Sequence, residues 1–579
     1  MRRRGKRQFT TRLEITTLLK WTYAVVFVIS ALQLYRWQVI YHDKFSEIGK
    51  IYVQAQRRLI NERGSIYTKD GITIATDRIT WEPYISVVHE EEYQKLVEKW
   101  PTLRKHLKSI ADIDLPEEPP TLKKVAYYPL KKQINEETKL KLQQAFKKDK
   151  IIGVYFKEQN RRFYPLGDFA SHVLGFVQQK SRDEAIGVYG IEGYFWPEIS
   201  GRKGEIIHEK DITGRILSAA DYKRFVLREG KNIVLTIDSK IQQKVEEILA
   251  KKVEEYQAKS GTVIVMDPKT GAILAMANYP NYDPNFYFEV TDYSVFKNKA
   301  VSDPYEYGSV QKPLTLAIAL EEGAITPDYT CYDTGVLEVL DKKIYNFRRR
   351  KYGLLDITGI LLHSDNVCSA TVALKLTPEQ MYTYLQKLGI GTVFNIGLQD
   401  EETSFIKPLN KWNKVDLAVS AFGQMISATP LQIISAHSAL ANNGVRMQPY
   451  IIKEIYDSEE KIQFKPYAAA YVFSSQTVKT ITKAMADATM SRALFKKYKG
   501  KVNIAGKTGT SQIPNPEGTG YLEDAVNTTF VGFAPAEDAK VIMLVKFEQP
   551  QTHRTGSTTA APTWVEIFDA IAPYLGIIR

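Results

Sequence analysis

SVQK at residues 309–312, SDN at 364–366 and KTGT at 507–510 are the stretches of this chain that decide its fold and its chemistry. In this order they can form a serine acyl-transfer site that needs no histidine. On a helix, Ser309 and Lys312 lie one turn apart on the same face, so a neutral lysine can act as the base beside the serine hydroxyl. The three stretches therefore predict an enzyme that forms a covalent acyl intermediate on Ser309.

The remaining polar residues of these stretches have complementary predicted roles. Burial and a like charge at Lys507 would lower the pKa of Lys312, and Lys507 would attract an anionic substrate. Ser364 can relay a proton to the leaving amine, and Asn366 can hold a substrate amide. Gly509 would let a substrate backbone approach the edge of a strand closely.

Each stretch is weak evidence by itself, because S-x-x-K occurs about once or twice by chance in a chain of this length. Ser294–Lys297 also fits that pattern, and Lys269–Gly271 also fits K-T-G. Ser309, however, follows a glycine and opens the apolar helical run Leu314–Leu320, whereas Ser294 has no such context. We therefore assign the nucleophile to Ser309.

The N-terminus predicts a membrane anchor. The formal charge of the 579-residue chain is +12, and six basic residues lie among the first twelve. Such a tail could also bind DNA, but residues 21–35 carry no charge and, extended to 15–37, are long enough to span a bilayer. Positive charges stay cytoplasmic, so we expect residues 1–14 inside and the rest outside the membrane. A cleaved signal peptide is the alternative, although no convincing small-x-small cleavage site follows.

Hydrophobic periodicity predicts the order of elements after the anchor. An amphipathic helix is expected near 41–59, a turn at 69–71, helices between 90 and 150 interrupted by a loop at 114–120, and strands over 161–230. A new domain is expected to open at Lys231 with a strand, a helix capped by Asp238 and a hairpin of strands 261–266 and 272–277. Helices follow between 309 and 450, and strands return at 530–547.

The two cysteines, Cys331 and Cys368, lie in the region expected outside the membrane. An oxidising compartment permits a disulfide, but sequence cannot show that they are close. We favour the simpler interpretation that Cys368 is a small buried apolar residue.

At this point the chain resembles the class B penicillin-binding proteins, which are membrane-anchored peptidoglycan D,D-transpeptidases, and the similarity covers nearly everything after the anchor. Residues 63–66 (RGSI), 162–167 (RFYPLG) continuing to Gly175, and 190–192 (GIE) with 201–204 (GRKG) resemble the three N-terminal motifs of this family. Residues 235–238 (LTID), 422–424 (FGQ) and 429–432 (TPLQ) resemble further family motifs.

The resemblance implies a multidomain α+β fold: a single transmembrane helix, an extended β-rich dimerisation or pedestal module at 38–230, and a transpeptidase domain at 231–579. That domain would contain an antiparallel sheet packed with helices and a helical subdomain. Ser309 resembles the acylated nucleophile, Lys312 its base, and Ser364 and Asn366 the proton-relay and substrate-binding pair. Lys507, Thr508 and Thr510 resemble the residues that hold the substrate carboxylate, beside Gly509. The N–H groups of Ser309 and Thr510 would form the oxyanion hole.

The family implies no metal and no cofactor. Its ligands are peptidoglycan stem peptides, lipid-linked precursor polymer and β-lactam antibiotics. The short chain and the absence of a C-terminal repeat resemble the septal, FtsI-like type, with an FtsW-like membrane glycan polymerase and other division proteins as partners and no nucleic acid. An elongation-type enzyme is the alternative.

The chain departs from the family pattern at two positions. Tyr307 replaces a proline that sets the start of the nucleophile's helix, which puts the geometry of that start in doubt. Asp365 is unusual in this class and is typical of β-lactamases. His363 beside it is interpreted as structural rather than as a catalytic base.

Two other functions remain possible. A β-lactamase or penicillin sensor would be expected to carry a glutamate at position 406, and this chain has Ile406 before Leu409-Asn410. The other possibility is a catalytically silent scaffold of the division machinery. The intact nucleophile, base and carboxylate-binding residues argue against it. Labelled penicillin separates the three by stable acylation, turnover or no reaction.

Overall fold

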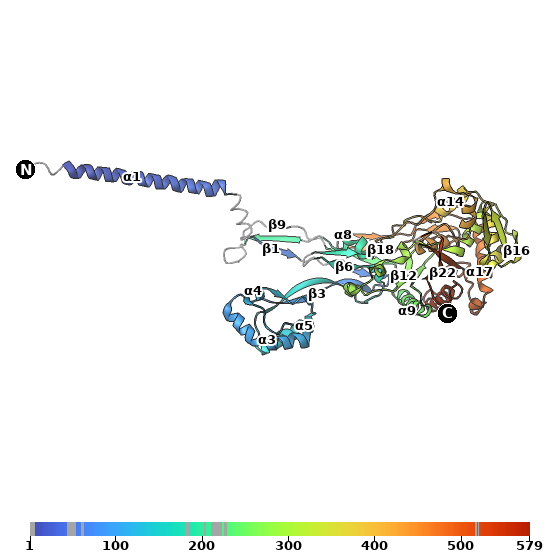
Figure 1. Cartoon of the computed structure of the whole chain (residues 1–579), viewed down its shortest axis with the longest axis horizontal. Coiled ribbons are helices and arrows are strands. Elements are labelled where there is room, and N and C mark those ends of the chain that lie inside the picture. The colour runs from blue at the N-terminus through green and yellow to red at the C-terminus, as the bar shows by residue number, and fades with distance from the viewer. Residues whose placement is uncertain are drawn as a thin grey trace, which may run out of the picture. The chain divides into compact units, whose positions relative to one another are not determined.

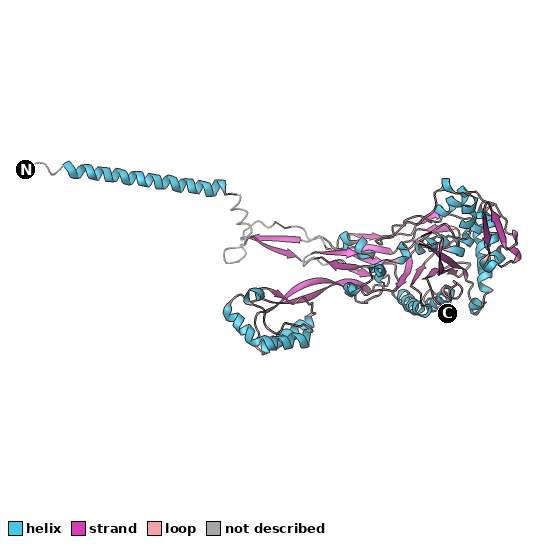
Figure 2. Ribbon diagram, viewed as in Figure 1, coloured by secondary structure: helices cyan, strands magenta, loops and turns pink. Residues whose placement is uncertain are grey.

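The computed structural model describes residues 6–42, 54–59, 63–180, 184–201, 204–209, 223–224, 229–515, 518 and 520–578. The chain is a multidomain α+β protein with two compact units, one formed by residues 1–61 and 202–228 and the other by 62–201 and 229–579 (Figure 1). The second unit contains most of the strands and all three SVQK, SDN and KTGT stretches (Figure 2).

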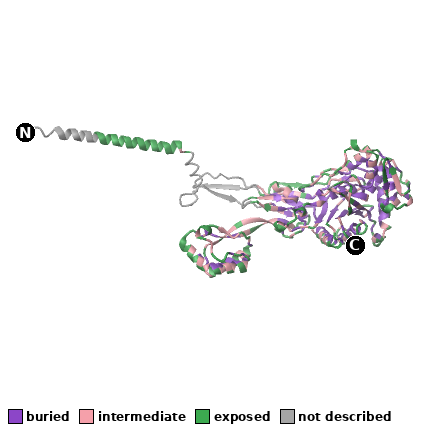
Figure 3. Ribbon diagram, viewed as in Figure 1, coloured by how far each residue is buried: buried purple, intermediate pink, exposed green. Residues whose placement is uncertain are grey.

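The first unit begins with the predicted apolar helix. Helix α1 (Lys6–Tyr35) continues as the short π-helix η1 (Arg36–Ile40). Residues 17–40, with a mean hydropathy of 1.5, form the one helical stretch of the described chain that is long and apolar enough to cross a membrane. Its side chains are exposed, as Figure 3 shows, which is the arrangement expected of a helix surrounded by lipid.

The prediction of a helix near 41–59 is wrong at residues 54–59. Residues 54–59 form strand β1 (Gln54–Leu59), which pairs antiparallel with β8 (Gly204–Glu209), and β8 also pairs with β9 (Lys223–Arg224). Local periodicity cannot reveal a strand partner so far along the chain. Most of the rest of the predicted helix, residues 43–53, lies outside the described residues.

A seven-stranded sheet joins the N-terminal part of the second unit to its C-terminal part. Its order is β19-β18-β10-β2-β3-β4, with β5 pairing β3. The predicted turn at 69–71 connects β2 and β3, which pair antiparallel. Strand β10 pairs parallel with β2. The strands are β2 (Ile66–Tyr67), β3 (Thr73–Ile85), β4 (Tyr128–Pro129), β5 (Val154–Phe163), β10 (Asn232–Leu235), β18 (Ile452–Tyr456) and β19 (Lys461–Gln463).

The helices predicted between 90 and 150 are present, with the predicted loop between them. They are α3 (Glu90–Ala111), α4 (Leu122–Val125) and α5 (Glu136–Lys148), and they enclose a core of their own around Trp100. The described part of the region 161–230 is less strand-rich than expected. Besides β5, β8 and β9 it contains β6 (Phe176–Gln179), β7 (Ala185–Val188) and the short helices α6 (Ser171–Leu174), α7 (Gly190–Tyr194) and α8 (Trp196–Ile199).

The N-terminal sequence motifs meet in one buried ion-pair network. Arg162 Nε lies 2.5 Å from Glu192 Oε1, and Arg162 Nη1 donates to the carbonyl of Gly64 at 2.8 Å. Arg63 and Asp77 form a neighbouring pair at 3.2 Å. Charges this deeply buried persist only when they are paired, so the network explains why these residue types occur together. Of the 201–204 stretch, Arg202 and Lys203 lie outside the described residues.

The region after Lys231 is built on a five-stranded antiparallel sheet in the order β12-β11-β23-β22-β21. The predicted hairpin and the predicted C-terminal strands are both part of it, and β21 is an edge strand. The strands are β11 (Ser260–Met266), β12 (Ile273–Tyr279), β21 (Ala505–Pro514), β22 (Tyr521–Ala534) and β23 (Val541–Glu548).

Helices cover both faces of this sheet because its strands alternate apolar side chains between two cores. One core contains Val263, Val265 and Val545 together with the Asp238-capped helix α9 (Ser239–Tyr256) and the terminal helix α18 (Ala560–Ile571), which was not predicted. The other core contains Ile264 and Leu544 with α11 (Lys312–Glu321) and α16 (Pro430–Ala441).

A mainly helical subdomain adjoins the second core. It contains the other helices expected between 309 and 450, besides α11 and α16. Short strands that were not expected accompany them and frame the SDN stretch. The elements are α12 (Ile357–His363), α13 (Asn366–Ala373), α14 (Pro378–Lys387), α15 (Lys414–Ser420), α17 (Ser475–Met490), β13 (Thr330–Asp333), β14 (Val336–Val339), β15 (Lys342–Tyr345), β16 (Gly353–Asp356), β17 (Val445–Met447) and β20 (Ala468–Tyr471).

Candidate active site

The nucleophile candidate lies on a tight turn that leads into a helix. Ser309 belongs to the 3₁₀-helix η4 (Gly308–Gln311), and Lys312 is the first residue of α11. Residues i and i+3 of a 3₁₀ turn lie on the same side, so the predicted one-turn separation is present. Gly308 has φ +62°, and its N–H donates to the carbonyl of Gly423 at 3.2 Å, which fixes the start of the turn.

The proline missing at Tyr307 does not disturb this turn. Tyr307 is buried, and its hydroxyl donates to Gln311 Oε1 at 2.9 Å, which ties the residue before the turn to the turn itself. Pro313 lies at the beginning of α11 and supplies the preset φ angle there. The doubt raised by the sequence about this geometry is therefore removed.

Lys312 is completely buried and makes three contacts with the SDN stretch. Its Nζ lies 2.5 Å from the Ser364 carbonyl oxygen, 2.7 Å from Asn366 Oδ1 and 3.2 Å from Ser364 Oγ. Burial lowers the pKa of Lys312 to about 7, and the charge of Asp365 partly opposes this. The sequence attributed the lowered pKa partly to Lys507, whereas the structure attributes it to burial.

Lys507 approaches the same serine from β21. Its Nζ donates to Ser364 Oγ and to the Thr508 carbonyl, both at 2.9 Å. Burial, followed by repulsion from Lys312 and Arg492, lowers the pKa of Lys507 well below its usual value. Two buried lysines on one hydroxyl do not easily hold two full charges, so an anion bound beside Lys507 would favour its charged form.

Ser364 owes its central position to an unusual backbone conformation. It ends α12 with φ +55°, a left-handed conformation that is uncommon for a residue other than glycine. This conformation directs both its carbonyl and its hydroxyl toward Lys312. Ser364 Oγ thereby connects the two lysines. Within the described residues, the Ser309 hydroxyl makes no hydrogen bond, so it is free to meet a ligand.

The structure shows a further reason for the glycine at position 509. A Cβ atom at this position would lie 2.9 Å from the Tyr307 carbonyl oxygen and 3.2 Å from Val310 Cγ1. The glycine therefore allows β21 to pack closely against the turn that carries Ser309, and the close approach of a substrate backbone stays a prediction. The hydroxyl of Thr510, the next residue, accepts from the N–H of Gly556 at 3.1 Å.

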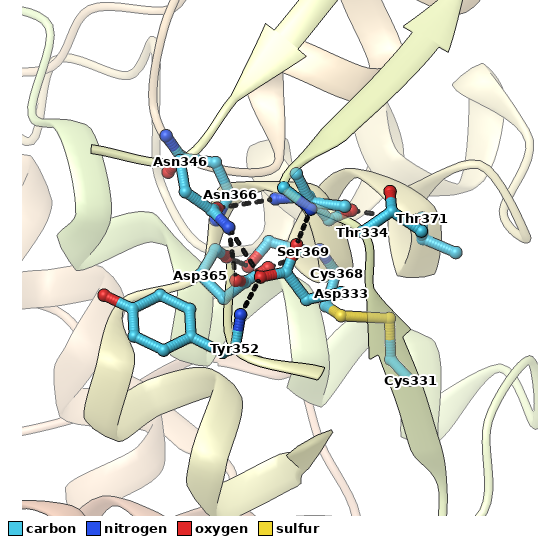
Figure 4. Close-up of a disulfide and its surroundings, with 12 residues drawn as sticks. Cys331, Asp333, Thr334, Asn346, Tyr352, Asp365, Asn366, Cys368, Ser369 and Thr371 are labelled. Carbon is cyan, nitrogen blue, oxygen red and sulfur yellow. Dashed lines mark hydrogen bonds between the residues drawn. A yellow bond between two sulfur atoms is a disulfide. The ribbon is translucent and has the colours of Figure 1, made fainter. Parts of the chain in front are cut away.

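The SDN stretch rests on buried residues that the sequence did not indicate (Figure 4). Asn346 Nδ2 donates to Asp365 Oδ2 at 2.7 Å and to Asp333 Oδ2 at 3.0 Å, and Asn346 Oδ1 accepts from the N–H of Asn366 at 2.7 Å. Asp365 also caps α13 by accepting from the N–H of Cys368. Burial, together with the charge of Asp333, raises the pKa of Asp365 to about 6.

The preference for an unpaired Cys368 is wrong. Cys331 on β13 and Cys368 on α13 form a disulfide, which Figure 4 shows to the right of Asp365. The two cysteines are 37 residues apart in sequence. The pairing of β13 with β16, which lies shortly before α13, brings them together, and sequence spacing alone could not show this. The disulfide fastens the helix that begins at Asn366.

Other polar residues near the site have structural contacts. Arg492 is close enough to influence Lys507, and its guanidinium donates to the Leu362 carbonyl at 2.8 Å. His363 stacks on Tyr352, with 4.3 Å between the ring centroids. Thr429 and Gln432 form a capping box at the start of α16. The described residues contain no group of three or more His, Cys, Asp or Glu side chains suited to a metal ion.

Neither decoy resembles the site. Ser294 lies in the 3₁₀-helix η3 (Tyr293–Phe296), and Lys297 forms an ion pair with Glu402 at 3.0 Å. Lys269 lies in the turn between β11 and β12 and pairs with Asp538.

Comparisons with known proteins agree with this architecture. The family model described as "Penicillin binding protein transpeptidase domain" matches residues 261–571, and the "Penicillin-binding Protein dimerisation domain" matches residues 59–235. Stage V sporulation protein D of Bacillus subtilis is 31% identical over 96% of this chain and 84% of its own length.

Two further relatives are more distant. The peptidoglycan D,D-transpeptidase FtsI of Escherichia coli is 26% identical over 93% of this chain and 88% of its own length. The crystal structure of penicillin-binding protein 2X from Streptococcus thermophilus superimposes with a TM-score of 0.73 at 23% identity, covering 90% of this chain and 80% of that one. The latter shows that the fold is shared.

We predict that the double variant Cys331→Ala/Cys368→Ala loses about 2–4 kcal/mol of unfolding free energy, because it frees a long segment of the unfolded chain. Chemical denaturation of the purified chain measures this loss. Adding a reductant should destabilise the parent by a similar amount and leave the double variant unchanged. Equal stability of parent and variant would contradict a stabilising disulfide.

Proposed function

The chain belongs to the class B penicillin-binding proteins, and we propose that it is a peptidoglycan D,D-transpeptidase that cross-links stem peptides through an acyl-enzyme on Ser309. One observation carries the proposal: two buried lysines share the Ser364 hydroxyl beside an unengaged serine on a helical turn. A lysine whose pKa is lowered to about 7 can accept a proton near neutral pH.

The proposed acylation proceeds in two steps. Ser309 Oγ attacks the carbonyl carbon of the terminal D-Ala-D-Ala bond while its proton passes to Lys312, and the N–H groups of Ser309 and Thr510 stabilise the oxyanion. The tetrahedral intermediate then collapses as the C–N bond breaks. The leaving amine takes a proton through Ser364, so that D-alanine departs and the stem peptide remains as an ester on Ser309.

Transfer repeats these steps in reverse. The amine of a second stem peptide attacks the ester carbonyl, Lys312 accepts the proton that this amine loses, and Ser309 leaves with its proton restored. Lys507, Thr508 and Thr510 would hold the carboxylate of the substrate. Asn366 positions Lys312 through Oδ1, and its Nδ2, which donates to the Tyr345 carbonyl, has a second hydrogen for a substrate amide.

The location of this reaction follows from the anchor. Helix α1 with a cytoplasmic basic tail would place the site outside the cytoplasmic membrane of a bacterium, where peptidoglycan is assembled. No cofactor is required by the steps above.

We predict that penicillin acylates Ser309 and not Ser294. A labelled penicillin that does not cross membranes should modify the chain in intact spheroplasts, and mass spectrometry should place the adduct on the peptide that contains Ser309. Ser309→Ala should abolish labelling. Labelling of the solubilised chain but not of spheroplasts would overturn only the topology, rapid release of hydrolysed penicillin would favour a β-lactamase, and no adduct would favour a scaffold.

Lys312 and Lys507 are predicted not to be interchangeable. Lys312→Arg should lower the second-order rate of penicillin acylation by roughly 10²- to 10⁴-fold, since arginine stays protonated and cannot act as a base. Lys507→Arg keeps the charge that attracts the carboxylate and should slow acylation far less. In the parent, the rate should fall as the pH drops through about 7, because Lys312 becomes protonated. A pH-independent rate, or a Lys312→Arg variant as fast as the parent, would exclude Lys312 as the base.

The cellular role that we propose is cross-linking at the division septum with an FtsW-like polymerase. The FtsI relative supports this role, whereas the sporulation protein, which is similar over almost the whole chain, favours a second role in the wall of a spore. Depletion in the native cell distinguishes them: filaments indicate division, rounded cells indicate elongation, and normal growth with defective spores indicates sporulation.

A further inference from the structure

A cavity of about 400 Å³ adjoins the candidate active site and has no role in the mechanism above. Two of the elements that line it also carry site residues. Glu306 lies three residues before the nucleophile, and Ile513 and Pro514 form the end of β21, beyond the KTGT stretch. The cavity therefore reaches the end of β21 that lies beyond the KTGT stretch.

Glu306 is a carboxylate without a cationic partner among the described residues. The other two carboxylates that line the cavity are neutralised: Asp303 pairs with Lys546 at 2.5 Å, and Glu548 pairs with Lys299 at 2.5 Å and Lys259 at 2.8 Å. Glu306 accepts hydrogen bonds only from neutral groups, the Met425 N–H at 3.0 Å and the Tyr521 hydroxyl at 3.1 Å. A largely buried charge that lacks a counter-charge is unfavourable unless a ligand supplies one.

Asn527 adds a second unmet acceptor to the same cavity. It lies on β22 between Ser511 and Glu548, is 6% exposed, and its buried Oδ1 has no hydrogen-bond partner. Buried polar atoms without partners are rare, so this oxygen indicates a missing donor. A carboxylate and an unpartnered amide oxygen, carried by two residues that line one cavity, are together suited to an ammonium group, which carries one positive charge and three donors.

The direction of β21 indicates which ammonium group reaches the cavity. A peptide that joins the edge of β21 antiparallel, with its terminal carboxylate at Lys507 and Thr508, extends from there toward Ile513 and Pro514. The residues that precede its scissile bond therefore point to the cavity. Since cross-linking joins the acyl group of one stem peptide to an amine of another, each stem peptide carries such an amine.

We propose that Glu306 and Asn527 bind the side-chain ammonium of the donor stem peptide, and thereby select donors whose amine is still free. This inference rests on the proposed transpeptidase function and deepens it. A donor whose amine is already acylated has no positive charge there and would leave both acceptors unmet. The site would therefore prefer stem peptides that have not yet been cross-linked through that amine.

The test uses the full-length chain in detergent and two synthetic peptides that end in D-Ala-D-Ala. One has lysine before these residues, and the other has Nε-acetyl-lysine. The measured quantity is the second-order rate of D-alanine release for each peptide, and the parent should favour the free amine by roughly tenfold or more, as expected for a charge-assisted contact. Glu306→Gln should reduce this ratio to near one, and Asn527→Ala should reduce it partly.

Glu289→Gln is the matched control, because Glu289 is an exposed carboxylate on the 3₁₀-helix η2 (Pro284–Glu289) and does not line the cavity. It should keep the ratio of the parent. If Glu306→Gln does not fold, as judged by thermal unfolding, Asn527→Ala decides the outcome.

Penicillin, which need not carry an amine, separates the two levels of failure. A parent that penicillin does not acylate would refute the proposed function itself. A parent that penicillin acylates but that treats both peptides alike would overturn only this inference. The inference is also overturned if Glu306→Gln keeps the parent's ratio of D-alanine release rates for the two peptides.

Discussion

The burial of Lys312 is the constraint on which the rest of the site depends. A lysine amine without access to water must have its polar contacts supplied by the protein, and here the SDN stretch supplies three of them. Helix α11 and the turn at Ser364 are therefore held together by the same atoms to which the proposed mechanism assigns the chemistry. The left-handed conformation of Ser364 is retained because it brings two of the three acceptors to Lys312.

Two opposing effects set the proton affinity of this lysine. Burial favours its neutral form, and the charge of Asp365 favours its protonated form. Asp365 is itself buried and lies beside Asp333, with which it shares Asn346. Burial and the charge of Asp333 raise the pKa of Asp365, and the hydrogen bond from Asn346 partly opposes this. The disulfide below fastens the helix that Asp365 caps. The unusual aspartate thus helps to hold the proposed base in place, a structural role that the sequence did not suggest.

The sequence predicted several features that depend on local pattern. The anchor helix, the Asp238 cap, the strands of the central sheet and the turn at Ser309 all follow from periodicity, capping residues or glycine, and all are present. The sequence could not predict features that depend on chain segments meeting in space. Strand β1 needs β8, the disulfide needs β13, and Asn346 reaches Asn366 only because β15 and α13 come together.

Gly509 shows the same limit within a correctly identified stretch. The pattern K-T-G-T indicated that a glycine was required, but the reason lies in the carbonyl of Tyr307, which no local spacing places beside β21. Likewise, the two lysines could be assigned to one site, but the sequence could not show that burial and the charge of Lys312 lower the pKa of Lys507, while burial lowers the pKa of Lys312.

The charges near the two ends of β21 would determine the orientation of a peptide that binds to its open edge. Unpaired strand edges bind extended peptides without regard to sequence, and they are normally a hazard because they bind in several registers. Here Lys507, whose charged form a bound carboxylate would favour, lies near the beginning of the strand, and Glu306, a carboxylate without a cationic partner among the described residues, lies near its end. A peptide with a terminal carboxylate and a side-chain ammonium satisfies both charges in one orientation, whereas the reversed peptide places like charges together. Electrostatics would then fix the scissile bond opposite Ser309, and the hydrogen bonds of the strand would need to supply only affinity.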